Sequence, residues 1–220
     1  MLPKKACSHG LVLIFFSNLY VGCIGNDIDV GTNFDGSLNI IDVVNTSENL
    51  WVYYQTYLNG FVMSQGDNMF TVTTTCIYNR LRGVSDKDYN FTKYQYSQDA
   101  WSADNYTGTF IYSNETDKKK PPEAMYVDLE GERKADEIWT LKYTDPDNHT
   151  CNVYEITSVG NVVTKGGPMC EMHIKDSQVQ KGPPTNCLNF YKQKCEGKTY
   201  QPYQPYCQGK GMEDMVIVRK

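Results

Sequence analysis

The sequence predicts an all-β domain in which eight antiparallel strands close into an up-and-down barrel, with a short helix before the strands and another after them. Three observations predict it. From Leu50 onward, apolar and aromatic residues alternate with polar ones, the period of half-buried strands. Turn sequences such as Asp145-Pro146-Asp147-Asn148 separate most of these segments. Eight segments in succession favour a barrel, because closure removes exposed edge strands and leaves room for one small ligand.

The elements are expected in a simple order, without an internal repeat or a linker. Apolar residues at helical spacing predict a short helix over 38–44, capped by Asp35 or Ser37. Alternation and turn signals then predict the strands at 50–58, 69–80, 89–97, 106–113, 125–129, 137–144, 151–158 and 169–176.

A second helix is predicted after Pro183-Pro184, from a cap at Thr185 or Asn186 to about Lys194, and Gly197 stops it. At 100° per residue, three side chains of this helix fall within about 80° of one another. They are Cys187, Tyr191 and Cys195. One face of the helix is therefore suited to forming disulfides with the barrel wall and packing against it.

The N-terminal residues 1–25 have the order of a secretory signal peptide. Lys4 and Lys5 precede an apolar run at 11–16, and small residues then lead to a cleavage position after Gly25. The run is too short to span a bilayer. We therefore expect a secreted protein whose single domain covers residues 26–220, enough chain for a sizeable core.

The charge of the chain argues against two classes of partner. The formal net charge is −5, and it becomes −7 once the leader's two lysines are removed. The only basic run is 118–120. An acidic body of this kind is not expected to bind nucleic acid or an anionic membrane.

Cysteines and glycosylation sequons agree with secretion. An even number of cysteines follows the leader, which predicts three disulfides in any of fifteen pairings: Cys76, Cys151, Cys170, Cys187, Cys195 and Cys207. Their spacing is not that of a zinc site, so no metal is expected. Five Asn-X-Ser/Thr sequons predict solvent-facing glycosylation positions at Asn45, Asn90, Asn105, Asn114 and Asn148.

Catalysis is not expected. Only His149 and His173 follow the leader, and all six later cysteines are taken by disulfides. The chain contains no G-x-S-x-G, P-loop or H-E-x-x-H motif. We predict a binding protein without a cofactor rather than an enzyme.

Several local sequences indicate which family of binding proteins the chain resembles. The order of elements resembles a lipocalin, and the words Cys151-Asn-Val-Tyr, Cys170-Glu-Met-His and Pro184-Thr-Asn-Cys187 resemble the tick salivary lipocalins of the histamine-binding family. The segment 48–54 resembles the family's first strand. The resemblance covers nearly the whole chain after the leader. It implies the bridges Cys76–Cys207, Cys151–Cys187 and Cys170–Cys195, and secretion in saliva.

The resemblance also implies a ligand site in the barrel lumen. Glu171 stands where the family has a carboxylate that pairs with an amine, whereas Asn152 replaces the other carboxylate and His173 replaces an aromatic residue. Tyr57 matches a first-strand tyrosine of the family. Gly60 and Met63 stand where a second site would need an acid and a tryptophan, so one amine site is expected. Aromatic residues that are candidates for the lumen are Tyr57, Tyr106, Tyr112, Tyr126, Trp139, Tyr143 and Tyr154.

A dehydrated ammonium needs a carboxylate and hydrogen bonds in place of water, and aromatic faces add about 0.5–2 kcal/mol each. The leading interpretation is therefore capture of histamine or serotonin by Glu171 in a monomer that suppresses host defence. One alternative is a leukotriene or fatty acid held by Lys93 or Lys142. Another is a host complement or clotting protein bound by surface loops, with the segment 118–122 as the candidate.

Overall fold

The structure is a computed structural model, and it describes residues 38–65, 68–113, 120–131, 137–159 and 169–210. The expected signal peptide at 1–25 lies outside these residues. The same holds for Asn114 and for the helix caps expected at Asp35 or Ser37. Within the described residues, no helix is both long and apolar enough to cross a membrane.

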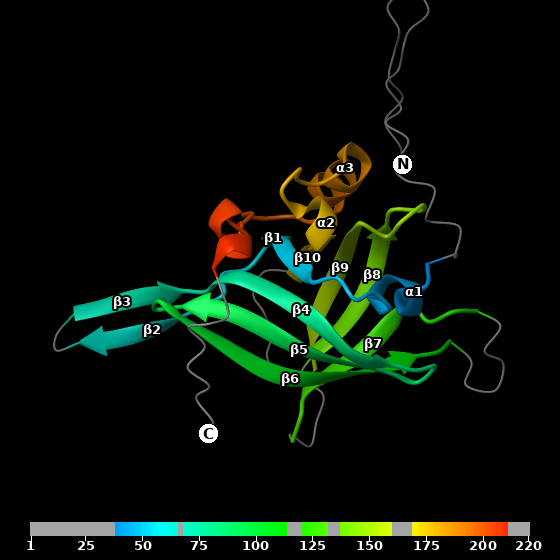
Figure 1. Cartoon of the computed structure of the whole chain (residues 1–220), viewed down its shortest axis with the longest axis horizontal. Coiled ribbons are helices and arrows are strands. Elements are labelled where there is room, and N and C mark those ends of the chain that lie inside the picture. Colours follow the sequence, from blue (N-terminus) through cyan, green and yellow to red (C-terminus); the bar gives the residue numbers. More distant parts are fainter. Residues whose placement is uncertain (1–37, 66–67, 114–119, 132–136, 160–168, 211–220) are drawn as a thin grey trace, which may run out of the picture.

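Eight strands form a closed antiparallel barrel (Figure 1). Each strand pairs with its neighbours in the order β1-β10-β9-β8-β7-β6-β5-β4, and β1 closes the barrel by pairing with both β10 and β4. The prediction of an all-β, up-and-down barrel is thus confirmed. The strands are β1 (Leu50–Gln55), β4 (Thr75–Val84), β5 (Asp88–Ser97), β6 (Ala100–Ile111), β7 (Ala124–Leu129), β8 (Glu137–Thr144), β9 (Cys151–Ser158) and β10 (Met169–Lys175).

A β-hairpin that the sequence did not predict projects from the barrel (Figure 1). It consists of β2 (Gly60–Gln65) and β3 (Asn68–Thr73), which pair only with each other. The prediction of a single strand over 69–80 is therefore wrong. The strand is interrupted at Thr74, and β4 begins after it in a different sheet. At the break, the Thr74 amide donates to the Asn59 carbonyl (2.9 Å), and Cys76 adopts a positive φ of 51°.

The alternation of side chains produces two cores, one on each face of the barrel wall. The inner core lines the lumen and includes Phe91, Met125 and Trp139. The helix α1 (Ile40–Val44) packs Ile40 and Val43 into this inner core. Its N-cap is Asn39, whose side chain accepts from the Ile41 amide at 3.1 Å.

The outer core lies between the barrel wall and the C-terminal segments. These segments are α2 (Asp176–Val179), α3 (Thr185–Lys194) and a 3₁₀ helix (Pro205–Gly209). Phe190 and Tyr191 of α3 are buried there. Three disulfides join the segments to the wall: Cys76–Cys207, Cys151–Cys187 and Cys170–Cys195.

Candidate functional site

A carboxylate is buried in the barrel lumen. Glu171 lies on β10, where Cys170 and Met172 belong to the outer core, so alternation turns Glu171 inward. Its side chain has no solvent exposure. One oxygen accepts a hydrogen bond from the Tyr57 hydroxyl, and the other contacts His173 Nε2 at 2.5 Å. Because an ionised carboxylate only accepts, Nε2 of His173 carries the hydrogen in this contact.

The surroundings of Glu171 keep it ionised. Burial alone would raise the pKa of this carboxyl, but the His173 hydrogen bond, the charge of Lys93 and the Tyr57 hydrogen bond outweigh burial and lower the pKa to about 2. The lumen therefore holds a permanent negative charge near neutral pH.

Tyr57 reaches Glu171 from the segment that follows β1. The buried Gln55 fixes this segment: its side chain donates to the Tyr57 carbonyl (2.7 Å) and accepts from Asn59 (3.1 Å). The backbone of Gln55 also pairs with Tyr200. Burial, followed by the charge of Glu171, raises the pKa of the Tyr57 hydroxyl well above its usual value. Tyr57 thus stays a neutral donor to the carboxylate.

Two aromatic rings lie beside His173, the histidine that contacts the carboxylate. The His173 ring lies 4.9 Å from the Tyr154 ring and 5.6 Å from the Trp139 ring, between centroids. Trp139 donates its indole N–H to Glu137 at 2.7 Å. The Tyr154 hydroxyl is buried and has no hydrogen-bond partner among the described residues.

Two further buried polar atoms face the lumen without a partner in the described part of the chain. They are the Tyr89 hydroxyl and Oδ1 of Asn79. Buried polar groups normally have a hydrogen-bond partner, so those without one indicate a place for water or for a polar ligand. Together with Tyr154, they make the lumen suitable for a ligand with hydrogen-bonding groups.

Asn152 also points inward, and each of its polar atoms has a partner within the barrel. Its Oδ1 accepts from Thr144 at 2.6 Å, and its Nδ2 donates to the His149 carbonyl at 3.1 Å. The side chain has no solvent exposure. In this arrangement Asn152 ties β9 to the end of β8, and one N–H and one lone pair of its amide have no further contact among the described residues.

Lys93 supplies a cation on the opposite wall of the lumen. A cavity of about 110 Å³ is lined by Phe91, Lys93, Tyr106, Val127, Glu137 and Trp139. The ammonium of Lys93 lies 5.9 Å from the Trp139 ring centroid. Burial would lower the pKa of Lys93, but the charges of Glu171 and Glu137 raise it. Lys142, by contrast, points outward and pairs with Glu155 at 3.5 Å.

The remaining aromatic candidates divide between the two sides of the wall. Tyr106 lines the lumen cavity. Tyr143 does not face the lumen as expected, since a register shift in β8 turns it outward onto Phe190, 5.1 Å between ring centroids. Tyr126 is 42 % exposed, whereas Tyr112 is half-buried against the inner core and donates its hydroxyl to the Asp86 carbonyl at 2.5 Å. Neither contributes to the site around Glu171.

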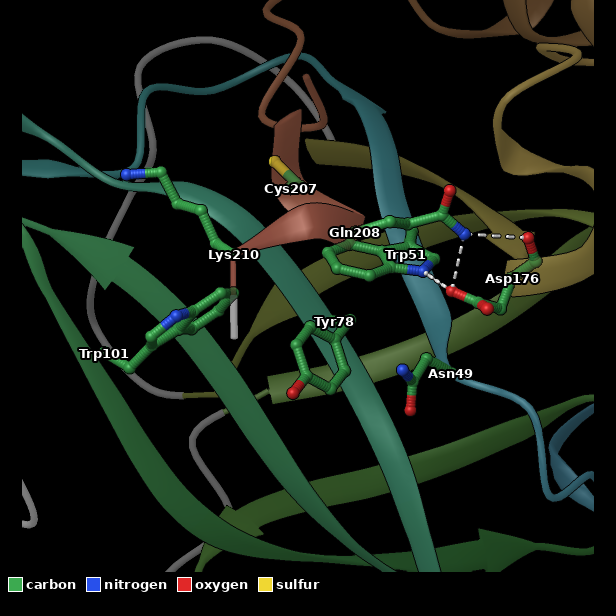
Figure 2. A pocket seen from close by; sticks show the side chains of 8 residues that line it. All are labelled: Asn49, Trp51, Tyr78, Trp101, Asp176, Cys207, Gln208 and Lys210. Atoms are coloured by element: carbon green, nitrogen blue, oxygen red, sulfur yellow. Dashed lines mark hydrogen bonds between the residues drawn. The ribbon is translucent and has the colours of Figure 1, made fainter. Parts of the chain in front are cut away.

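A second hollow, of about 240 Å³, lies on the outer face of the wall (Figure 2). Its lining includes Trp51, Tyr78, Trp101 and Lys210. Asp176 Oδ1 at its edge already accepts from Trp51 (2.6 Å) and Gln208 (2.9 Å). The Lys210 ammonium faces the Tyr96 ring at 3.7 Å. These contacts attach the C-terminal segment to the barrel, so we assign the hollow to the seam between them.

Sequence reasoning did not identify the groups that face Glu171 across the lumen. The sequence assigns Lys93 a role only toward an acidic ligand, and no pattern in it singles out Glu137. The signal was present, because Lys93 shares the parity of Tyr89 and Phe91 on one strand. Among the described residues, no three His, Cys, Asp or Glu side chains gather as a metal site would require.

The closed barrel, the buried carboxylate and the aromatic lumen define a ligand-binding barrel of the lipocalin type. Residues 36–209 match the family model described as tick histamine binding protein, so the chain belongs to the tick histamine binding protein family. This is a family of ligand-binding proteins, not of enzymes. No curated protein sequence matches the chain.

Three solved structures are similar to the chain, and the first of them supports the fold. The crystal structure of the AM182 serotonin complex is 14% identical, with a TM-score of 0.53 over 80% of this chain and 97% of that one. Japanin from Rhipicephalus appendiculatus, bound to cholesterol, is 8% identical, with a TM-score of 0.46 over 74% of this chain and 96% of that one. The siderocalin Ex-FABP is 13% identical, with a TM-score of 0.39 over 67% and 79%.

Proposed function

We propose that the protein sequesters one small organic amine in its lumen, with Glu171 as the counter-ion. The observation that carries this proposal is an ionised carboxylate with no solvent exposure, set among aromatic rings. A fixed negative charge in such a place attracts an ammonium, because water no longer screens the pair.

The contacts around Glu171 leave capacity for an ammonium. Its two oxygens together offer about four lone-pair sites, of which Tyr57 and His173 use two. The aromatic rings of Trp139 and Tyr154 provide faces for cation–π contact or for a ligand ring. The orphaned hydroxyl of Tyr154 would pair with a polar group on the ligand.

Histamine and serotonin are the first candidates. Membership of the tick histamine binding protein family supports an amine, as does the serotonin bound by the AM182 neighbour. Secreted with tick saliva, the protein would withdraw such a mediator from the host and so suppress its defence. Stoichiometric capture, with no chemical step, is sufficient for this role.

A second candidate function rests on Lys93. Its ammonium borders the lumen cavity beside the apolar and aromatic side chains of Phe91, Val127 and Trp139. This combination suits an apolar acid, such as a fatty acid or a leukotriene, whose carboxylate would pair with Lys93. Glu171 and Glu137 oppose that ligand, since they already surround Lys93 with negative charge.

Calorimetric titration of the secreted protein with histamine, serotonin, leukotriene and fatty acid separates the two candidates. We expect saturable one-site amine binding, weakened about 100-fold or more in Glu171→Gln, because breaking a buried ion pair costs about 3–5 kcal/mol. The matched control is Glu155→Gln, on the outer face of the adjacent strand. Binding of the apolar acids without any amine binding would replace the first candidate by the second.

A further inference from the structure

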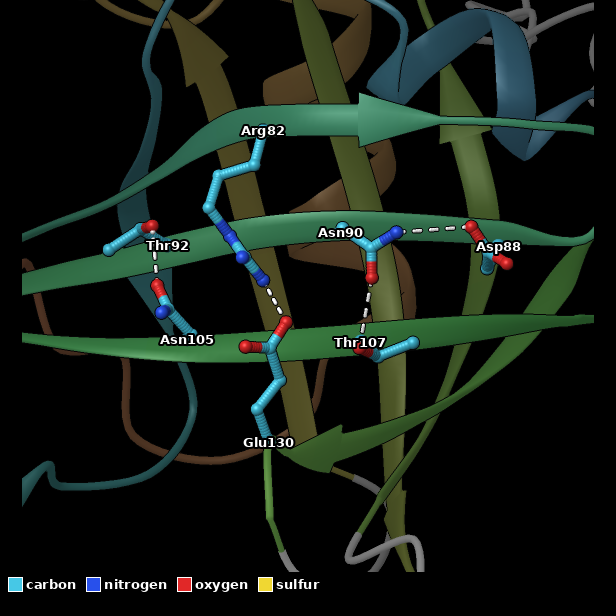
Figure 3. Close-up of polar contacts among 7 residues, drawn as sticks. All are labelled: Arg82, Asp88, Asn90, Thr92, Asn105, Thr107 and Glu130. Atoms are coloured by element: carbon cyan, nitrogen blue, oxygen red, sulfur yellow. Dashed lines mark hydrogen bonds and ion pairs between the residues drawn. The ribbon is translucent and has the colours of Figure 1, made fainter.

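Two glycosylation sequons lie side by side on the outer face of the barrel (Figure 3). The first is Asn90-Phe91-Thr92 on β5, and the second is Asn105-Tyr106-Thr107 on β6. The strands pair so that the asparagine of each sequon lies opposite the threonine of the other. Directly opposite residues of antiparallel strands share a face, so both asparagines emerge from the same side of the wall.

The two sequons are hydrogen-bonded to each other. The Thr92 hydroxyl donates to Asn105 Oδ1 at 2.8 Å, and the Thr107 hydroxyl donates to Asn90 Oδ1 at 3.0 Å. Nδ2 of Asn90 donates to Asp88 at 3.1 Å. The ion pair of Arg82 with Glu130 lies between the two Asn–Thr pairs in Figure 3. The amides are therefore held outward at fixed positions.

We propose that Asn90 and Asn105 both carry N-linked glycans, which together cover the outer face of β5 and β6. The donor is a lipid-linked oligosaccharide diphosphate. The amide nitrogen Nδ2 forms a bond to the anomeric carbon of the sugar, the bond from that carbon to the diphosphate oxygen breaks, and Nδ2 loses one proton. The lipid diphosphate departs with the electron pair of the broken bond, and the proton passes to water.

The folded structure accommodates both modifications without losing a hydrogen bond. Glycosylation consumes one hydrogen of Nδ2 and leaves Oδ1 unchanged. Asn90 therefore keeps one N–H for Asp88 and its carbonyl for Thr107, and Asn105 keeps its carbonyl for Thr92. Asn105 is exposed and Asn90 is half-buried, so both sugars would extend into solvent.

The proposal has a consequence for binding partners. The C-terminal helices and the 3₁₀ helix pack on the outer core. Asn90 and Asn105 are not part of this core, so these helices do not cover the wall around them. Two neighbouring glycans would cover that part of the wall. A protein partner, if the molecule has one, would then have to dock on another face.

Site-specific mass spectrometry of the full chain, secreted from eukaryotic cells, tests the proposal. After release of the glycans by a peptide N-glycosidase in H₂¹⁸O, each glycosylated asparagine becomes an ¹⁸O-labelled aspartate. Trypsin isolates Asn90 within residues 88–93, but Asn105 shares its tryptic peptide with Asn114. Chymotrypsin, which cleaves after Tyr106 and Tyr112, separates those two positions.

We expect ¹⁸O label at both Asn90 and Asn105. The variants Asn90→Gln and Asn105→Gln should each lose the mass of one glycan, and the double variant should lose two. Thr107→Ser is the matched control, because it keeps both the sequon and the hydroxyl that bonds Asn90. An unlabelled Asn90 or Asn105 in properly secreted, disulfide-bonded protein would overturn the proposal of a paired glycan face.

Discussion

Lys93 on β5 and Glu171 on β10 act on each other across the lumen, although their strands are not neighbours in the sheet. The charge of Lys93 contributes to lowering the pKa of Glu171, and the charge of Glu171 contributes to raising the pKa of Lys93. The two pKa shifts are opposite in direction, and each favours the charged form of its group. The barrel thus contains its own cation for the carboxylate that we propose as the ligand's partner.

Lys93→Met is expected to strengthen amine binding about tenfold, because it removes a like charge from the lumen and leaves Glu171 for the ligand. The same change should weaken any binding of a fatty acid or leukotriene. Calorimetric titration measures both. Lys142→Met, which removes a lysine from the outer face, should change neither. Weaker amine binding in Lys93→Met would contradict the assigned roles.

Acid should destabilise the protein through Glu171. Its folded-state pKa is about 2, below its usual value of 4.5. The associated stability is therefore fully present above pH 4.5 and is lost as the pH falls from 4.5 toward 2, by on the order of 3 kcal/mol. Urea unfolding at a series of pH values measures this loss. Glu171→Gln should show a shallower dependence over the same window, and equal slopes would refute the assignment.

His173→Phe is expected to lower the free energy of unfolding at pH 7 by about 1.5–3 kcal/mol. The change keeps an aromatic ring beside Trp139 and Tyr154 but removes the hydrogen-bond donor to a buried, charged Glu171. Urea denaturation gives the value. His173→Gln, which restores an N–H donor, should recover part of the loss. A His173→Phe variant more stable than His173→Gln would indicate that the ring, rather than the donor, matters.

The disulfides are expected to differ in their contributions. Cys76–Cys207 closes a separation of 131 residues, and Cys170–Cys195 closes one of 25. The chain-entropy account gives more stability to the longer loop. Replacing the first pair with alanines should therefore destabilise the protein by about 1 kcal/mol more than replacing the second, in thermal or urea unfolding. The reverse order would show that lost packing around the alanines dominates.

The sequence predicted the barrel because alternation and turns are local signals, and every strand of the barrel overlaps an expected segment, although β4 and β6 only in part. Parity along β10 also predicts an inward Glu171 once Cys170 is known to face outward. Trp139 and Tyr154 belong to the inner core for the same reason. Such features depend on the alternation of side chains along a single strand, so they can be predicted without knowing which distant segments are in contact.

Other features depend on contacts that alternation does not encode. The alternation through residues 69–80 continues across Thr74, so it could not show that β3 and β4 belong to different sheets. A register shift between Leu141 and Tyr143 reversed the side on which Tyr143 lies. Lys93 and Glu171 lie 78 positions apart in the sequence. Their charges interact because closure of the barrel brings β5 and β10 to the same lumen.

The bridge between Cys76 and Cys207 also has a consequence for proteolysis. It encloses β4 to β10 and the helices that follow them. A protease that cuts the backbone once, anywhere between these two cysteines, therefore produces two pieces that are still covalently joined. Because most of the barrel strands lie inside this ring, a nicked molecule would keep its walls together, and only reduction of the bridge would allow the pieces to separate.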